Sequence, residues 1–171
     1  AYAELAQTIY GIGALCVFLE IEGLDRVLGG GLVPGSLLLL AGEPGIGKST
    51  LLLQVAANLA RSTGPVVYIS GEESAEQVAL RARRLDGLHE ALLLLPETSF
   101  EAALGQLDEL EPALIVVDSV QTAVVDEVDA VAGSVSQVRQ VAARYQHLAK
   151  TRGIPVVLVG HVTKDGAIAG P

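Results

Sequence analysis

The segment Gly42-Glu-Pro-Gly-Ile-Gly-Lys48-Ser49 constrains the fold of this chain more than any other feature. It follows an apolar run at Ser36–Ala41, and it opens a stretch of leucines and alanines at helical spacing over Lys48–Arg61. In the pattern G-x-x-x-x-G-K-[ST], glycines let backbone N–H groups turn inward around phosphate oxygens, and the helix amino end adds partial positive charge. The segment therefore predicts a buried strand, a phosphate-binding loop and a helix, in that order.

This loop predicts that the chain binds ATP, with Mg²⁺ as the cofactor. We expect Lys48 to reach the β- and γ-phosphates and to act in catalysis, and the Ser49 hydroxyl to ligate Mg²⁺. The plain alternative is a glycine-rich turn with a solvated lysine. A guanine-specific site would need N-K-x-D, but the only asparagine is Asn58, inside the predicted helix. The expected nucleotide-binding residues are Gly42, Glu43, Pro44, Gly45, Ile46, Gly47, Lys48, Ser49 and Thr50.

Strand and helix signals alternate along the rest of the chain. Short continuous apolar runs are typical of strands buried on both faces, as in a parallel sheet covered by helices. The expected further strands are Val66–Ser70, Ala91–Leu95, Leu114–Asp118 and Pro155–Gly160. Capping boxes are expected at Ser74 with Gln77, Thr98 with Glu101, and Ser134 with Gln137, before helices that end near Leu85, Leu110 and Arg152. The alternation predicts an α/β domain with a mostly parallel sheet and helices on both faces.

Acidic residues follow two of these strands. Asp118 ends the run Leu114–Val117, at the edge where an α/β sheet opens its ligand crevice, so we expect it to hold the magnesium shell. A turn or helix cap is the alternative for Asp118. Glu72 and Glu73 follow the second strand, where a carboxylate can orient the attacking water. Glu72 is the expected catalytic acid, Glu73 is the second candidate, and the alternative is that both only favour the dipole of the next helix.

Residues after the fifth strand suggest a response to the nucleotide. His161 can sense the γ-phosphate and pass its presence to the following loop, or it can be an ordinary hydrogen-bonded loop residue. Lys164 can contact a DNA phosphate or a neighbouring subunit's nucleotide, and a solvated lysine is the alternative. The arginines on two predicted helices, including Arg81, Arg83 and Arg84, are interpreted as solvated faces.

Composition restricts the other function classes. The formal charge is −9, and four tyrosines with two phenylalanines are the only aromatic residues, which argues against bulk charge or a stacking platform as the main nucleic-acid contact. The single cysteine, Cys16, cannot form an intrachain disulfide or a multi-cysteine zinc site. No apolar stretch reaches transmembrane length. We expect a cytoplasmic protein without a membrane partner.

Six motifs in order give the chain a family resemblance. They are Leu24–Ser36, the phosphate loop, Tyr68–Ser74, Val117–Thr122, Gly133–Arg139 and Gly160–Lys164. Together they closely resemble the ATPase core of the RadA (Sms) family of bacterial DNA-repair proteins. The resemblance covers about residues 21–171 and implies a RecA-like P-loop ATPase fold. The strand that ends at His161 is then expected between the phosphate-loop strand and the Asp118 strand.

The resemblance also implies a function and partners. It implies a DNA-dependent ATPase that forms a homo-hexamer, binds single-stranded DNA, works with the RecA recombinase, and drives branch migration in recombination and repair. Glu72 matches the family's catalytic glutamate, His161 its switch residue, and Lys164 lies in its DNA-facing loop. Residues 1–20 are left unassigned, and we expect residues 21–171 to be a fragment that lacks the family's zinc finger and carboxyl-terminal protease-like domain. The alternatives are a nucleotide-dependent ring-assembly module without DNA-stimulated turnover, and a small-molecule phosphotransferase.

Overall fold

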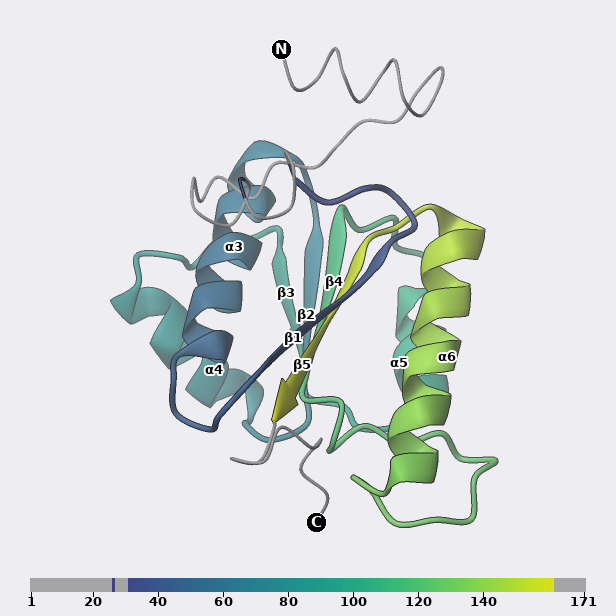
Figure 1. Cartoon of the computed structure of the whole chain (residues 1–171). Coiled ribbons are helices and arrows are strands. Elements are labelled where there is room, and N and C mark those ends of the chain that lie inside the picture. Colours follow the sequence, from purple (N-terminus) through teal and green to yellow (C-terminus); the bar gives the residue numbers. More distant parts are fainter. Residues whose placement is uncertain (1–25, 27–30, 162–171) are drawn as a thin grey trace.

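A computed structural model of the chain describes residue 26 and residues 31–161. The predictions for residues 1–20 and for Lys164 lie outside this part. Five parallel strands form one sheet in the order β1-β5-β4-β2-β3 (Figure 1). Their bounds are β1 Leu37–Gly42, β2 Val66–Ser70, β3 Leu92–Leu95, β4 Leu114–Asp118 and β5 Val156–His161. The order confirms the prediction that β5 lies between the phosphate-loop strand and the Asp118 strand.

Helices cover the two faces of the sheet in pairs. The bounds of the described helices are α3 Lys48–Ser62, α4 Ala75–Arg84, α5 Phe100–Leu107 and α6 Val135–Arg152. Figure 1 shows α3 and α4 on one side of the sheet and α5 and α6 on the other. The two sides hold separate apolar clusters, one with α3 and α4 and one with α5 and α6. The predicted α/β fold with helices on both faces is therefore confirmed.

The alternation of side chains along a strand divides the core between these two layers. In β2, Val66 and Tyr68 pack with α3 and α4, whereas Val67 and Ile69 pack with α5 and α6. All five residues of β2 are buried, because helices cover both faces. This arrangement explains why the central strands are continuously apolar in sequence, and it places Tyr68 on the same side as the phosphate-binding helix.

Two of the predicted capping boxes need correction. Ser74 and Gln77 form the complete box before α4, as predicted. Thr98 does not cap α5; Ser99 does, by accepting a hydrogen bond from the Ala102 amide. The carboxylate of Glu97 instead accepts from the backbone amides of Thr98 and Ser99, so the chain enters the helix one residue later than predicted.

The third predicted box, at the start of α6, is only half present. Ser134 caps the helix by accepting from the Gln137 amide. The Gln137 side chain does not return to Ser134: it turns inward, is 2% exposed, and bonds the backbone of Val125, Val128 and Ala130. Three carbonyl groups and one amide of the segment before α6 thus depend on a single side chain. The far end of α6 agrees with prediction, with Gly153 in the left-handed region at φ 68°.

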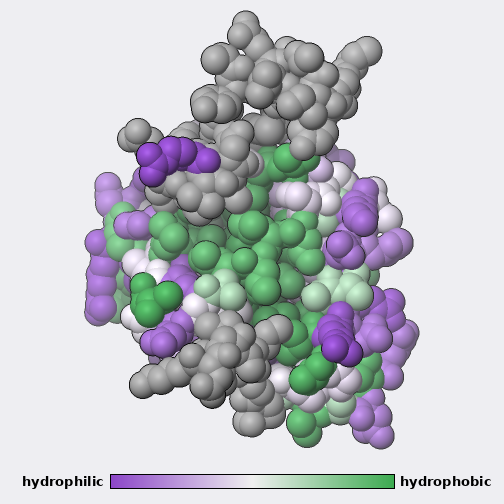
Figure 2. Space-filling view, in the orientation of Figure 1, coloured by the Kyte–Doolittle hydropathy of each residue, from purple (hydrophilic) through white to green (hydrophobic). Residues whose placement is uncertain are grey.

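Strand β1 lies at an edge of the sheet and leaves apolar surface uncovered. Leu39 is 49% exposed, and it borders an apolar cavity of about 240 Å³ beside α6. Figure 2 shows apolar residues gathered over the middle of this face, where Figure 1 shows β1 and β5. Within the described residues, none of the helices is long and apolar enough to span a membrane.

Candidate nucleotide site

The phosphate-binding loop joins the carboxyl end of β1 to the amino end of α3. Gly45 and Gly47 have φ angles of 81° and 95°, in the left-handed region that only glycine adopts without strain. Gly47 caps α3 without any side-chain hydrogen bond, and the first turn of the helix carries no acidic residue. The free amide groups of a helix amino end attract an anion. The loop therefore has the backbone geometry of an anion site.

The side chain of Lys48 forms hydrogen bonds to the backbone at the start of this loop. Its Nζ donates hydrogen bonds to the carbonyl oxygens of Gly42 at 2.9 Å and Glu43 at 2.8 Å. Lys48 is only 6% exposed, although lysine is rarely buried unless paired. The two carbonyl groups satisfy part of its hydrogen-bonding capacity, and the ammonium group remains at the wall of the cavity next to the loop.

That cavity has a volume of about 250 Å³ and combines residues from three parts of the chain. The loop and the first turn of α3 form most of its wall, Arg81 comes from α4, and His161 comes from the end of β5. The lining residues are Gly45, Gly47, Lys48, Ser49, Thr50, Arg81 and His161. The structure therefore brings the predicted loop and His161 to one place, and it adds Arg81, which the sequence had assigned to a solvated face.

Asp118 lies next to the first turn of α3, and Tyr68 connects the two. The Tyr68 hydroxyl donates a 2.5 Å hydrogen bond to Asp118 Oδ2, and its oxygen lies 3.5 Å from the Ser49 carbonyl oxygen. Burial, followed by the charge of Asp118, raises the pKa of Tyr68 far above its ordinary value. The phenol therefore stays protonated and donates its hydrogen bond to Asp118.

Sequence reasoning missed this role of Tyr68. The sequence patterns place Tyr68 only within the expected strand Val66–Ser70 and the motif Tyr68–Ser74. A signal was present, because a tyrosine in an otherwise aliphatic buried strand needs a partner for its hydroxyl. The identity of that partner depends on the pairing of β2 with β4, in which Ser70 lies opposite Asp118.

The residues around Asp118 and Ser49 fit a magnesium ion. Both supply oxygen, which Mg²⁺ prefers, and one or two protein oxygens together with substrate phosphates are its usual ligands in nucleotide sites. Among the described residues, no group of three or more histidine, cysteine, aspartate and glutamate side chains is placed to hold a metal ion. The donor set of Ser49 and Asp118 is thus one that would hold magnesium together with a polyphosphate.

Glu72 and Glu73 are neighbours in sequence but have different partners. Glu72 Oε1 accepts a 2.7 Å hydrogen bond from Ser119 Oγ, and it lies 3.2 Å from His161 Nε2. Glu73 forms an ion pair with Arg81 on α4. Glu72 thus joins the ends of β4 and β5, beside the cavity that His161 lines, whereas Glu73 is held against α4. This separation favours Glu72 over Glu73 as the acid nearest the end of β5.

Both the backbone and the ring of His161 contact neighbouring residues at the end of β5. The Gln121 side chain donates to the His161 carbonyl oxygen at 3.0 Å. Among the described residues, His161 Nδ1 is buried without a hydrogen-bond partner. The His161 side chain therefore contacts Glu72 and also lines the phosphate cavity.

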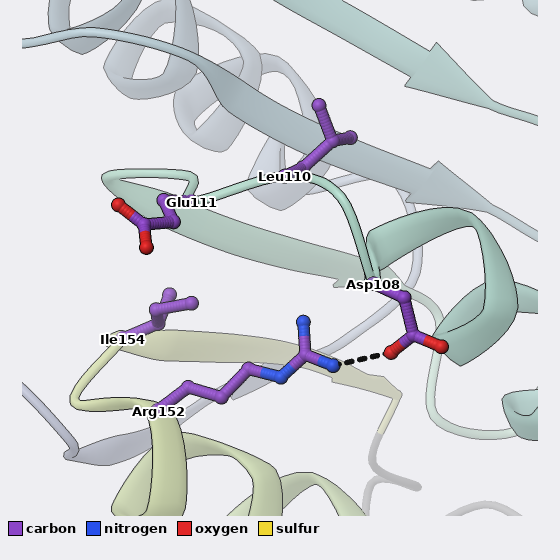
Figure 3. Close-up of a pocket in the computed structure, with 5 residues that line it drawn as sticks. All are labelled: Asp108, Leu110, Glu111, Arg152 and Ile154. Carbon is purple, nitrogen blue, oxygen red and sulfur yellow. Dashed lines mark hydrogen bonds and ion pairs between the residues drawn. The ribbon is translucent and has the colours of Figure 1, made fainter.

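A larger cavity lies at the other end of the sheet. It measures about 420 Å³ and is lined by Asp108, Leu110, Glu111, Arg152 and Ile154 (Figure 3). Arg152 pairs with Asp108 at 2.5 Å and donates to the Leu107 carbonyl oxygen, so its charge serves to join the ends of α5 and α6. Parallel α/β sheets bind ligands at the carboxyl ends of their strands. Size alone therefore does not make this cavity the candidate site.

Comparisons with known proteins agree with this geometry. The model of a family described as an AAA domain matches residues 18–167. The chain is 51% identical over 152 residues to the DNA repair protein RadA of Streptococcus pneumoniae, which covers 89% of this chain and 36% of that protein. It is 54% identical over 152 residues to RadA of Bacillus subtilis, covering 89% of this chain and 33% of that protein. The chain thus spans about a third of the length of these curated relatives.

Proposed function

The chain belongs to the AAA domain family, and on this premise we propose that it is the ATP-hydrolysing core of a DNA-repair protein similar to RadA. The observation that carries the proposal is the convergence at one edge of the sheet. The phosphate loop follows β1, Asp118 ends β4, Glu72 follows β2, and His161 ends β5. The groups proposed for phosphate binding, metal coordination and water activation therefore come from the ends of four strands at the same edge of the sheet.

Phosphate binding would use the amides at the amino end of α3 and the Lys48 side chain. The amides at the start of α3 would donate hydrogen bonds to the β- and γ-phosphate oxygens, and Lys48 would exchange the carbonyl oxygens of Gly42 and Glu43 for phosphate oxygens. The ammonium group stabilises the negative charge on the transferred phosphoryl group. Because the lysine already lies beside the cavity, this exchange needs a side-chain movement and no refolding of α3.

Magnesium would be held by the Ser49 hydroxyl and by Asp118, the latter directly or through water. When bound, the ion neutralises charge on the β- and γ-phosphate oxygens. Tyr68 keeps the Asp118 carboxylate oriented and donates to one of its oxygens. Asp118 is 7% exposed, so its orientation is set by the surrounding protein and not by bulk water.

Hydrolysis requires a group that orients water, and Glu72 is the proposed general base. Water oxygen bonds to the γ-phosphorus while the bond from that phosphorus to the bridging oxygen of ADP breaks, and Glu72 accepts the proton that water loses. Ser119 holds the carboxylate in place through its hydroxyl. His161, which contacts both Glu72 and the phosphate cavity, would report the γ-phosphate to the residues that follow β5.

The finer part of the proposal concerns DNA and assembly. We propose that turnover depends on single-stranded DNA, with Lys164 facing the DNA, and that the protein acts as a homo-hexamer with RecA in branch migration. The support is the similarity to proteins named DNA repair protein RadA. Lys164 lies outside the described residues, so these steps rest on that similarity and on the motif Gly160–Lys164.

The test is steady-state ATP hydrolysis with and without single-stranded DNA. Glu72→Gln serves as the blank, and Glu90→Gln, at an exposed position outside the site, is the control for loss of one negative charge. DNA-stimulated turnover that disappears only in Glu72→Gln supports the proposal. Turnover indifferent to DNA would favour a ring-assembly module, and ADP formation that needs an added metabolite would favour a phosphotransferase; either result overturns the DNA-dependent step.

A further inference from the structure

Arg81 occupies a position that separates it from the other arginines of its helix. Arg83 and Arg84 on α4 are exposed. The Arg81 side chain is 27% exposed, and it lines the cavity formed by the phosphate loop and the first turn of α3. Together with Lys48, it gives this cavity a second cationic side chain, and the two cations come from different helices. An amphipathic solvated face explains Arg83 and Arg84, but it does not explain Arg81.

The guanidinium of Arg81 is held by Glu73. The contact joins Nη2 to one carboxylate oxygen, Oε1, and the Glu73 side chain is 34% exposed. Guanidinium carries five N–H donors in a planar fork, which is suited to binding phosphate oxygens, so a contact through Nη2 does not exhaust it. A half-exposed ion pair of this kind adds little to stability, because water screens it. The pair therefore limits the position of Arg81 more than it stabilises the fold.

Arg81 also lines the same cavity as Ser49. Ser49 is the residue whose hydroxyl would hold magnesium beside the phosphates. The geometry thus places Arg81 beside the space where the β- and γ-phosphates would lie.

We propose that Arg81 is a phosphate-binding residue of the nucleotide site. When a nucleoside triphosphate binds, the Arg81 side chain moves away from Glu73 and contacts the terminal phosphate. This inference rests on the proposed function, because it requires ATP in the loop. Glu73 then acts as the group that positions Arg81 until a triphosphate binds. The arrangement makes the affinity for a triphosphate depend on an arginine from the same subunit, in addition to Lys48 and the loop amides.

The experiment measures the dissociation constants of ATP and ADP, with magnesium, for the full chain and its variants. Arg81→Gln should raise the ATP dissociation constant by about tenfold and change that of ADP much less, because the lost contact is to the terminal phosphate. Arg81→Lys should recover part of the loss, since it restores charge without the planar fork. Arg84→Gln, which removes the same charge from an exposed position of the same helix, is the control and should bind ATP as the unmodified chain does.

Glu73→Gln separates phosphate binding from a structural role of the ion pair. If Arg81 binds phosphate, releasing it from Glu73 should leave ATP affinity unchanged or increase it. If the pair only supports the β2–α4 connection, Glu73→Gln and Arg81→Gln should weaken binding of ATP and ADP alike, and that result would overturn the inference. Normal ATP binding by Arg81→Gln would also overturn it while leaving the proposed function intact. Failure of the unmodified chain to bind ATP more tightly than Lys48→Ala would overturn both.

Discussion

Removing the Tyr68 hydroxyl should weaken the magnesium site while leaving the phosphate loop in place. Tyr68→Phe keeps the aromatic ring, which packs among α3 and α4, and removes the donor to Asp118 Oδ2. The change is therefore confined to one hydrogen bond between two buried side chains, with Tyr68 1% and Asp118 7% exposed. Asp118 then carries its charge in the same place with one donor fewer.

The magnitude follows from that burial. A hydrogen bond to a charged group contributes about 1.5–3 kcal/mol, so we expect the free energy of unfolding to fall by about 2 kcal/mol. For a domain of this size, the loss corresponds to a melting temperature lower by roughly 4–8 °C. Residues that orient a metal ligand typically contribute about tenfold to a hundredfold to metal affinity. The magnesium concentration needed for half-maximal ATP binding should therefore rise by at least about tenfold.

The assay is ATP binding titrated with magnesium, followed with a fluorescent ATP analogue and paired with a thermal melt. Tyr145→Phe is the matched control, because Tyr145 is also 1% exposed but lies on the opposite face of the sheet, against Phe100 with ring centroids 5.0 Å apart. That variant should change the melting temperature only and leave the magnesium requirement as it is. An unchanged magnesium requirement in Tyr68→Phe, or an equal shift in Tyr145→Phe, would refute the role given to the Tyr68–Asp118 bond.

Three further substitutions test separate parts of the structure. Lys48→Ala should abolish tight ATP binding, because a buried positive charge leaves the phosphate loop; unchanged affinity by calorimetry would contradict the assignment. Glu72→Gln should keep ATP binding and lose turnover, and turnover at the level of the unmodified chain would move the general base elsewhere. Gln137→Ala should lower the free energy of unfolding by about 3 kcal/mol or more, because it leaves buried backbone groups of Val125 and Val128 without their partner. The measurement is unfolding in denaturant. A loss below about 1 kcal/mol would show that water replaces the side-chain amide.

The elements of the sheet could be predicted because their signals are local. Strand β2 begins and ends where its composition indicates, and Gly153 ends α6 as a left-handed glycine. The two corrected caps show where local signals compete. Thr98 and Glu101 have capping-box spacing, but Glu97 accepts from the Thr98 amide that the box would use, and Ser99 caps the helix instead. The sequence pattern alone does not predict whether Glu97 or the Thr98–Glu101 box will bind the Thr98 amide.

Gln137 and Tyr68 illustrate a different limit. Gln137 satisfies the capping-box pattern in sequence, yet its side-chain amide bonds the backbone of a segment about ten residues earlier. Those backbone groups are buried, so leaving them unpaired costs more than leaving an amide unpaired at an exposed helix start. Tyr68 depends on the register that brings β2 beside β4. Both outcomes are set by contacts between distant segments, which local patterns do not encode.

The two glutamates after β2 show how such contacts assign chemistry. The sequence predicts Glu72 as the catalytic acid and leaves Glu73 as the second candidate, since both follow the strand and precede the same helix. In the structure, Glu72 is directed to Ser119 and His161, at the ends of β4 and β5, while Glu73 is taken by Arg81. A general base needs a carboxylate positioned beside the attacking water, and the ion pair with Arg81 directs Glu73 toward α4. The same contact that disqualifies Glu73 as the base fits it to hold Arg81. Glu72→Gln should therefore reduce turnover at constant ATP affinity, whereas Glu73→Gln should change the affinity for ATP. If one variant showed both effects, the two carboxylates would work as a single unit.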